Sequence, residues 1–159
     1  MQIKNRISAF QEEMTSWRHH FHEHPELAYK EINTSKKVVE LLKSFGIDNI
    51  EEGLGKTGIV ATLENGTGKS IGLRADMDAL PIFEENNDKK YKSKTDGKMH
   101  ACGHDGHTTM LLGAAKYLSE TKNFNGKVIL IFQPAEEGFA GAKAMIEDGL
   151  LEKYPIDEI

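Results

Sequence analysis

The chain contains the run Val128-Ile129-Leu130-Ile131-Phe132-Gln133-Pro134-Ala135-Glu136-Glu137. Its first five residues are apolar without alternation, which is typical of a strand buried on both faces. Such strands lie inside sheets that helices cover, and open α/β sheets bind their ligands at the carboxyl ends of the strands. We therefore expect the adjacent carboxylates Glu136 and Glu137 to lie at a ligand-binding edge, although an ordinary acidic loop would contain the same pair.

Helix patterns lie on both sides of this strand. We expect four helices, at residues 3–21, about 34–45, about 106–120 and about 138–148. The first helix presents one apolar stripe to the core, from Ile3 to Phe21, until Pro25 ends it. Gly46 and Gly149 are expected to cap the second and fourth helices. The polar segment 84–98 is predicted to be a loop.

Two further strands are expected at about 58–63 and about 70–75. The turn residues Asn65-Gly66-Thr67-Gly68 between them favour an antiparallel hairpin. Helices that alternate with strands predict an α/β fold, in which helices sandwich a sheet of mixed direction. The length of 159 residues fits one such domain, because a chain of this size buries roughly two-thirds of its unfolded surface.

The only cysteine of the chain lies in the segment His100-Ala101-Cys102-Gly103-His104-Asp105-Gly106-His107. A lone cysteine cannot form an internal disulfide. The thiolate of Cys102 and the imidazole of His104 can instead share a borderline-soft divalent ion such as zinc. The two glycines give the backbone freedom to bring such donors together. The alternative is a glycine-rich loop with surface histidines and a buried structural thiol.

Asp76 and Asp78 lie on a strand-like segment that ends in Pro81. Alternate residues of a strand point to the same face, so these two carboxylates are expected to lie near each other. Buried together without cations or hydrogen bonds, they would be strongly unfavourable. They either orient ligating imidazoles, or they cap the following loop and pair with Arg74. For Asp76 both alternatives stay open.

Four stretches together resemble the amino-terminal part of an M20-family metallo-amidohydrolase, in the branch of N-acyl-amino-acid amidohydrolases, hippurate hydrolases and auxin-conjugate hydrolases. They are residues 17–27, 72–82, 100–107 and 132–138, and they occur in the family's order over nearly the whole chain. The resemblance implies that residues 1–159 are the amino-terminal part of a single zinc-exopeptidase-like catalytic domain. The lid domain and the carboxyl-terminal segment of the family would be absent from it.

The resemblance also implies roles for individual residues. Cys102, His104 and Glu137 would be metal ligands, and Glu136 would be the general base. Asp78 would support the metal site through contacts with the ligands and would not bind the ion itself. Two divalent ions are implied, zinc or manganese, with cobalt and nickel as further candidates. The implied reaction is hydrolysis of the amide bond of an N-acyl amino acid or a related small amide, in which Glu136 carries a proton from water to the leaving amine.

Family members are much longer than this chain, so we expect it to be a fragment. Two further histidine ligands would then lie outside it. The alternative function is that of a non-catalytic truncated relative, which folds and binds metal or nothing. A redox-active thiol is a third hypothesis, which the absence of a second cysteine weakens.

Composition predicts a soluble globular protein, with 38% hydrophobic and 28% charged residues. The net charge of −5 gives no electrostatic reason to bind nucleic acid. No apolar run approaches the roughly eighteen residues of a membrane helix, and no signal peptide is visible. Together with the single cysteine, this pattern predicts a cytoplasmic protein whose partner is its small-molecule substrate. Any homo-oligomer is expected to form mainly through the lid domain.

Three further signals favour simpler explanations. The histidines at positions 19, 20, 22 and 24 could bind a metal, but Pro25 ends the helix there and we expect a partly solvated helix end. The segment Gly66-Thr67-Gly68-Lys69-Ser70 is similar to the tail of a phosphate-binding P-loop, but it lacks the first glycine and precedes a strand, which favours a turn. We expect His107 to be packed, or to support the ligands, and not to be one.

Overall fold

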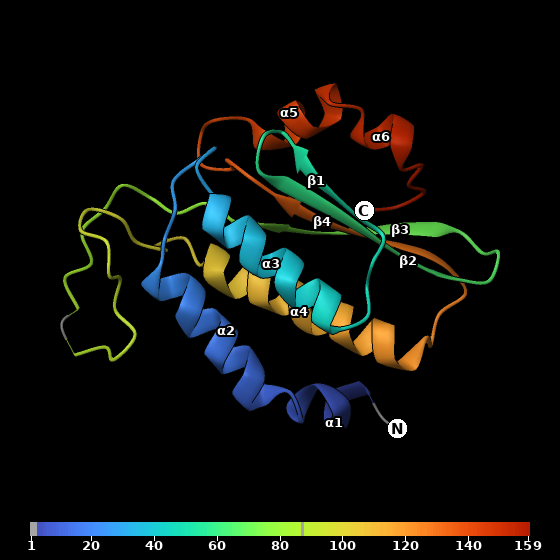
Figure 1. The fold of residues 1–159 in the computed structure, drawn as a ribbon, viewed down its shortest axis with the longest axis horizontal. Coiled ribbons are helices and arrows are strands. Elements are labelled where there is room, and N and C mark those ends of the chain that lie inside the picture. The colour runs from blue at the N-terminus through green and yellow to red at the C-terminus, as the bar shows by residue number, and fades with distance from the viewer. Residues whose placement is uncertain (1–2, 87) are drawn as a thin grey trace.

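The computed structural model describes residues 3–86 and 88–159. Within them, one sheet has the strand order β1-β2-β4-β3; its strands are β1 (Ile50–Leu54), β2 (Gly58–Asn65), β3 (Ser70–Asp76) and β4 (Gly126–Gln133). β4 pairs antiparallel with β2 and parallel with β3. The expected mixed α/β sheet is confirmed, and the apolar run of β4 lies inside it (Figure 1).

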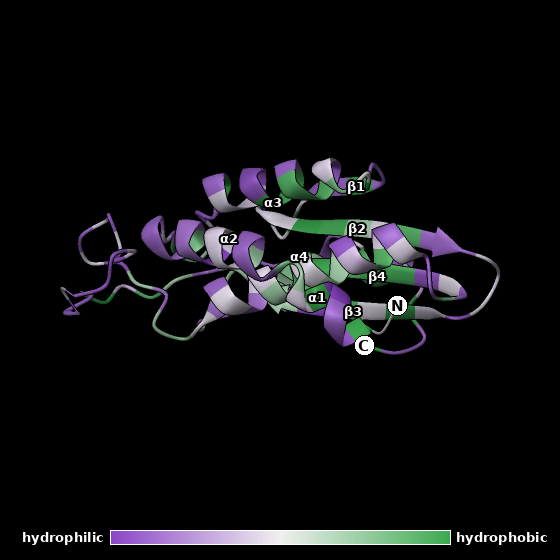
Figure 2. Cartoon of the chain, turned by 90° about the horizontal axis from the view of Figure 1, so that it is seen from below, coloured by the Kyte–Doolittle hydropathy of each residue, from purple (hydrophilic) through white to green (hydrophobic). Residues whose placement is uncertain are grey.

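The side chains of β4 alternate between two hydrophobic cores. Val128, Leu130 and Phe132 pack in the larger core with helices α2 (Gln11–Glu23), α3 (Ile32–Ser44) and α4 (His104–Thr121). Ile129 and Ile131 belong to a smaller core on the other face, with α5 (Gly141–Glu147) and α6 (Leu150–Lys153). The sheet is therefore sandwiched between helices, and Figure 2 shows its strands β2 and β4 as largely hydrophobic.

The expected hairpin between the strands at 58–63 and 70–75 is wrong. These strands are β2 and β3, and β4 lies between them with Leu130 opposite both Ala61 and Leu73. The physical reason is burial, because a strand that is apolar on both faces gains most from the middle of the sheet. The turn residues form a connection that packs on the segment before β4. A Cβ on Gly68 would lie 2.2 Å from the carbonyl oxygen of Asn125.

The expected first helix is divided in two. α1 (Ile3–Ser8) ends before Phe10, and α2 begins at Gln11. The chain turns there, and the buried Phe10 ring contacts the guanidinium of Arg6 and the ammonium of Lys116, which lie 4.6 and 4.7 Å from the ring centroid. Ile3 is 55% exposed, so the apolar stripe contacts the core only from Phe10 onward. Helix α2 ends at Glu23, as Pro25 predicts.

The other predicted helices are confirmed with shifted ends. α3 closes with two bonds typical of a glycine-capped helix, from the N–H of Gly46 to Lys43 and from the N–H of Ile47 to Leu42. α4 begins at His104, earlier than expected, and α5 begins at Gly141, later than expected. Gly149 follows α5 with a φ of +92°. None of the described helices is both long and apolar enough to cross a membrane.

Strand β1 was not expected from the sequence. Its residues Ile50-Glu51-Glu52-Gly53-Leu54 are mostly polar, and it lies at the edge of the sheet, where pairing with β2 specifies it. The described parts of segment 84–98 form a loop without helix or strand, as predicted. In the parallel pair β3–β4, Asp76 lies opposite Gln133. The segments that follow these two residues therefore leave the sheet side by side, next to the start of α4 (Figure 1).

Candidate metal centre

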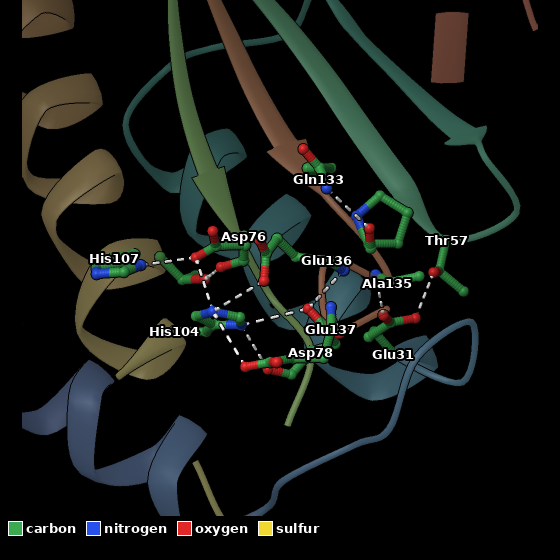
Figure 3. A network of polar contacts seen from close by, with 12 residues as sticks. Glu31, Thr57, Asp76, Asp78, His104, His107, Gln133, Ala135, Glu136 and Glu137 are labelled. Carbon is green, nitrogen blue, oxygen red and sulfur yellow. Dashed lines mark hydrogen bonds and ion pairs between the residues drawn. The ribbon is translucent and has the colours of Figure 1, made fainter. Parts of the chain in front are cut away.

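Three chain segments meet at this edge of the sheet. Asp76 ends β3, Glu136 and Glu137 follow β4, and His104 is the first residue of α4. We call the six residues gathered here the His104 cluster: Asp76, Asp78, Cys102, His104, Glu136 and Glu137. Figure 3 shows four of them, the carboxylates, around the imidazole of His104. The tertiary fold thus brings together all five residues that the sequence predicted for the site.

Cys102, His104 and Glu137 each offer one donor atom, and these three atoms lie within 4.8 Å of one another. Nε2 of His104 lies 3.8 Å from both Glu136 Oε2 and Glu137 Oε1. These separations are too long for hydrogen bonds, but they suit donors that share one ion. A thiolate, an imidazole and a carboxylate form a ligand set that divalent transition ions accept.

Asp78 links the histidine of the cluster to its two glutamates. Its carbonyl oxygen accepts a hydrogen bond from Nδ1 of His104 at 2.8 Å, which directs Nε2 toward the glutamates. Its carboxylate oxygens accept the backbone N–H groups of Glu136 and Glu137, each at 3.0 Å. Burial raises the pKa of Asp78, but the hydrogen bonds from His104 and from these N–H groups outweigh burial and lower it. Asp78 therefore remains an anion, and it orients His104 and the backbone of the two glutamates.

A second buried carboxylate supports the glutamate turn, and sequence reasoning missed it. Glu31 accepts the N–H of Ala135 at 2.8 Å and the hydroxyl of Thr57 at 2.6 Å (Figure 3). Ala135 has a φ of +51°, an uncommon conformation that these contacts help to hold. Burial raises the pKa of Glu31. No sequence pattern near Glu31 distinguishes it from a surface glutamate.

The electrostatics of the His104 cluster are dominated by carboxylates. Burial lowers the pKa of His104, but Asp78 and Asp76 reverse this effect and raise it to about 9. A hydrogen bond to Glu137, burial and further carboxylates raise the pKa of Cys102 to about 11. Both shifts favour the protonated forms, which is the expected response of these groups to nearby negative charge.

A divalent ion fits this arrangement on two counts. Oε1 of Glu137 is buried and has no hydrogen-bond partner, which is costly for a carboxylate unless a cation lies nearby. In addition, four carboxylates surround one imidazole, so the cluster carries excess negative charge that a divalent ion would neutralise.

Both alternatives for Asp76 describe real contacts. Its Oδ2 pairs with Arg74 at 3.1 Å, while its Oδ1 accepts a hydrogen bond from His107 Nδ1 at 2.7 Å and lies 3.6 Å from His104 Nε2. Of the two expectations for His107, the packed one is wrong, because its side chain is 47% exposed, whereas its contact with Asp76 agrees with a supporting residue. It lies on the outer side of the first turn of α4, where its imidazole reaches Asp76 and not the core.

The expectation of a partly solvated histidine tract fails at His22, which is buried. Its Nδ1 contacts Asp105 at 2.8 Å and its Nε2 contacts Glu84 at 3.1 Å. Arg18 lies 3.3 Å from the same Asp105 oxygen. These four residues, Arg18, His22, Glu84 and Asp105, form the His22 cluster. It ties α2, α4 and the 84–98 loop together, and contacts between such distant segments leave no local sequence pattern.

With this geometry established, comparison with known proteins gives a consistent result. The sequence is 56% identical to a hippurate hydrolase of Campylobacter jejuni, over 100% of this chain and 41% of the relative. It is 50% identical to an IAA-amino acid hydrolase of Arabidopsis thaliana, over 94% of this chain and 35% of the relative. The chain thus spans less than half the length of each of these two curated relatives.

Solved structures agree with the sequences. A Bacillus subtilis protein described as a dinuclear metal-binding peptidase from the M20 family superposes with a TM-score of 0.85 at 43% identity, over 91% of this chain and 40% of that one. Residues 72–159, which contain every member of the His104 cluster, match the model of peptidase family M20/M25/M40. From this match and from the shared fold, the chain belongs to peptidase family M20/M25/M40.

Proposed function

We propose that this chain supplies the metal-binding side chains and the general base of a metal-dependent hydrolase, which cleaves the amide bond of N-acyl amino acids or related small amides. The convergence of Cys102, His104 and Glu137 beside a second glutamate is the observation that carries the proposal. The substrate class is supported by the names of two relatives, a hippurate hydrolase and an IAA-amino acid hydrolase.

Cys102, His104 and Glu137 are the proposed metal ligands. Divalent ions at such a centre polarise a carbonyl group and lower the pKa of water. We propose two ions in the complete centre, as in the relative described as dinuclear, and zinc or manganese as their identity, with cobalt and nickel as alternatives. The ligands must lose their protons to bind, so metal uptake should release protons.

Glu136 is the proposed general base. Its side chain is 42% exposed, whereas the Glu137 side chain is 24% exposed and has one oxygen buried without a partner. A base must reach water and substrate with a carboxylate that is free to carry a proton, and Glu136 meets this requirement better. It would take a proton from the attacking water and deliver it to the leaving amine.

Asp78 is the proposed positioning residue. It directs Nε2 of His104 toward the glutamates, and it holds the backbone of both glutamates through its two oxygens. Catalysis tolerates little displacement of the reacting groups. Asp78 would therefore contribute to the rate by holding His104, Glu136 and Glu137 in place, without touching the substrate.

We further propose that residues 1–159 form the amino-terminal part of a single catalytic domain, which the partial coverage of the relatives supports. We propose the cytoplasm as its location, because a reducing compartment keeps the Cys102 thiol available to a metal. Its proposed partner is the small substrate. Neither nucleic acid nor a membrane is a proposed partner, and any homo-oligomer is proposed to form outside this chain, through a lid domain.

The decisive test is an assay of this chain, and of any longer protein that contains it, against N-acetyl and N-benzoyl amino acids with and without added Zn²⁺ or Mn²⁺. We expect metal-dependent release of the free amino acid by the longer protein. Hydrolysis that persists after complete metal removal would overturn the metal-dependent mechanism. A longer protein that binds metal and cleaves none of these amides would favour the non-catalytic relative.

A further inference from the structure

A second set of metal-donor side chains lies beside the proposed ligands. Asp76, His104 and His107 offer three donor atoms within 4.8 Å of one another, and we call them the Asp76 group. The group shares His104 with the proposed Cys102 ligand set, but its other two members, Asp76 and His107, do not belong to that set. Figure 3 shows the imidazole of His107 directed at Asp76 from the first turns of α4.

The orientation of Asp76 is fixed from its other side. Arg74 holds Oδ2 at 3.1 Å, and Arg74 is itself bonded through Nε to Gln133 at 2.7 Å. Thr108 donates its hydroxyl to the carbonyl oxygen of Asp76 at 2.9 Å, which fixes the backbone. Oδ1 is therefore left to face the two imidazoles, at 2.7 Å from His107 and 3.6 Å from His104.

The chemistry of the group suits a divalent transition ion. Two imidazoles and one carboxylate are a common ligand set for such ions, and they leave coordination positions open. Asp76 and His104 are buried, whereas His107 is half-exposed. Asp76 and His107 also line an open groove of about 590 Å³ beside β3 and α4, which gives an ion a path from solvent.

We propose that Asp76, His104 and His107 form an alternative metal position that competes with the Cys102, His104 and Glu137 set for a single ion. The competition follows from His104, because its Nδ1 donates to the Asp78 carbonyl and only Nε2 remains to bind. One ring nitrogen bonds one ion, so the two sets cannot both hold an ion through His104 at the same time. The inference rests on the proposed metal centre only through this shared histidine.

Thiolate chemistry allows the two positions to be distinguished by experiment. The parent chain, Cys102→Ala, Cys102→Ala/His107→Ala and Cys102→Ala/His24→Ala are loaded with Co²⁺, dialysed, and measured by elemental analysis and by absorption spectroscopy. His24 is an exposed histidine that belongs to neither set, so it provides the matched control. Circular dichroism verifies that each variant folds.

We expect the parent to bind one Co²⁺ with a thiolate-to-cobalt absorption band. Cys102→Ala should keep bound cobalt without this band. Adding His107→Ala should raise the Kd for Co²⁺ at least about tenfold, while adding His24→Ala should not change it. Equal cobalt binding with and without His107, or complete loss in Cys102→Ala alone, would overturn the alternative position and leave the Cys102 set standing. A parent chain that binds no cobalt would overturn both.

Discussion

Two buried histidines near the start of α4 are surrounded by carboxylates, yet they serve different purposes. In the His22 cluster both ring nitrogens contact carboxylates at 2.8 and 3.1 Å, and Arg18 adds a second positive group. In the His104 cluster Nε2 is 3.6–3.8 Å from three carboxylates and bonds none of them. Contacts at hydrogen-bond distance mark a structural cluster, whereas longer separations with excess negative charge mark a site for a cation.

The difference is one of degree, because Oδ1 of Asp105 in the His22 cluster is also buried without a partner. What separates the clusters is their charge. A doubly bonded His22 carries a proton on each nitrogen, so His22 and Arg18, with Lys89 at 3.5 Å from Glu84, balance Asp105 and Glu84. The His104 cluster has four carboxylates, against which stand one histidine and the neighbouring Arg74 and His107.

The largest expected effect concerns the two adjacent glutamates. In a protein that has the proposed activity, Glu136→Gln should lower kcat by a factor on the order of 10² to 10⁴ and leave bound metal unchanged, because it removes the proton carrier only. Glu137→Gln should instead lower metal affinity, with activity partly restored by high added metal. Steady-state kinetics and elemental analysis measure both. Loss of metal from Glu136→Gln alone would reverse the two roles.

Removing His22, the histidine of the structural cluster, should lower the stability of the fold and leave the amount of bound metal unchanged. His22→Ala removes the cation that Asp105 and Glu84 share and leaves Asp105 with Arg18 and Glu84 with Lys89, which should lower the free energy of unfolding by about 1–3 kcal/mol. Urea denaturation measures this change, and His24→Ala at an exposed position should stay within about 0.5 kcal/mol of the parent. If His22→Ala unfolds like the parent but loses bound metal, the assignment of the two clusters is wrong.

Asp78 should affect the metal centre through orientation. Asp78→Asn leaves one oxygen to accept the two backbone N–H groups, so it loosens the turn that carries Glu136 and Glu137. We expect metal affinity to fall by about 10- to 100-fold, as is usual for groups that support metal ligands. Isothermal titration with Zn²⁺ or Mn²⁺ measures the effect. Glu147→Gln, an acid-to-amide change on the exposed surface of α5, is the control and should have none.

The smallest effect should be the pH dependence that His22 contributes. The hydrogen bond to Asp105 raises its pKa above the usual 6.5, against the opposing effect of burial. A histidine with a raised folded pKa contributes stability that is fully present below pH 6.5 and is lost as pH rises through the folded value. The stability difference between the parent and His22→Gln should therefore shrink as pH increases above 6.5. A difference that grows with pH would contradict a protonated His22.

Much of the site could be predicted because its members lie in short, chemically unusual stretches. A single cysteine two residues from a histidine, an aspartate pair and adjacent glutamates after an apolar run are visible in the sequence, and the fold brings all of them together. The apolar run of β4 also predicted a sheet covered on both faces. Helix α3 was recognised from its periodicity and its terminal glycine, since both are local properties.

The tertiary structure alone decided which distant residues meet at the site and at the neighbouring structural cluster. Glu31 reaches Ala135 across 104 residues, and His22 reaches Asp105 across 83 residues. It also decided the strand order, in which β4 separates two strands whose connecting turn predicted a hairpin. The physical reason is that periodicity and turn chemistry record what a residue needs from its immediate neighbours. A strand or a charge is buried only when distant segments of the chain have folded around it, so its burial depends on the whole fold.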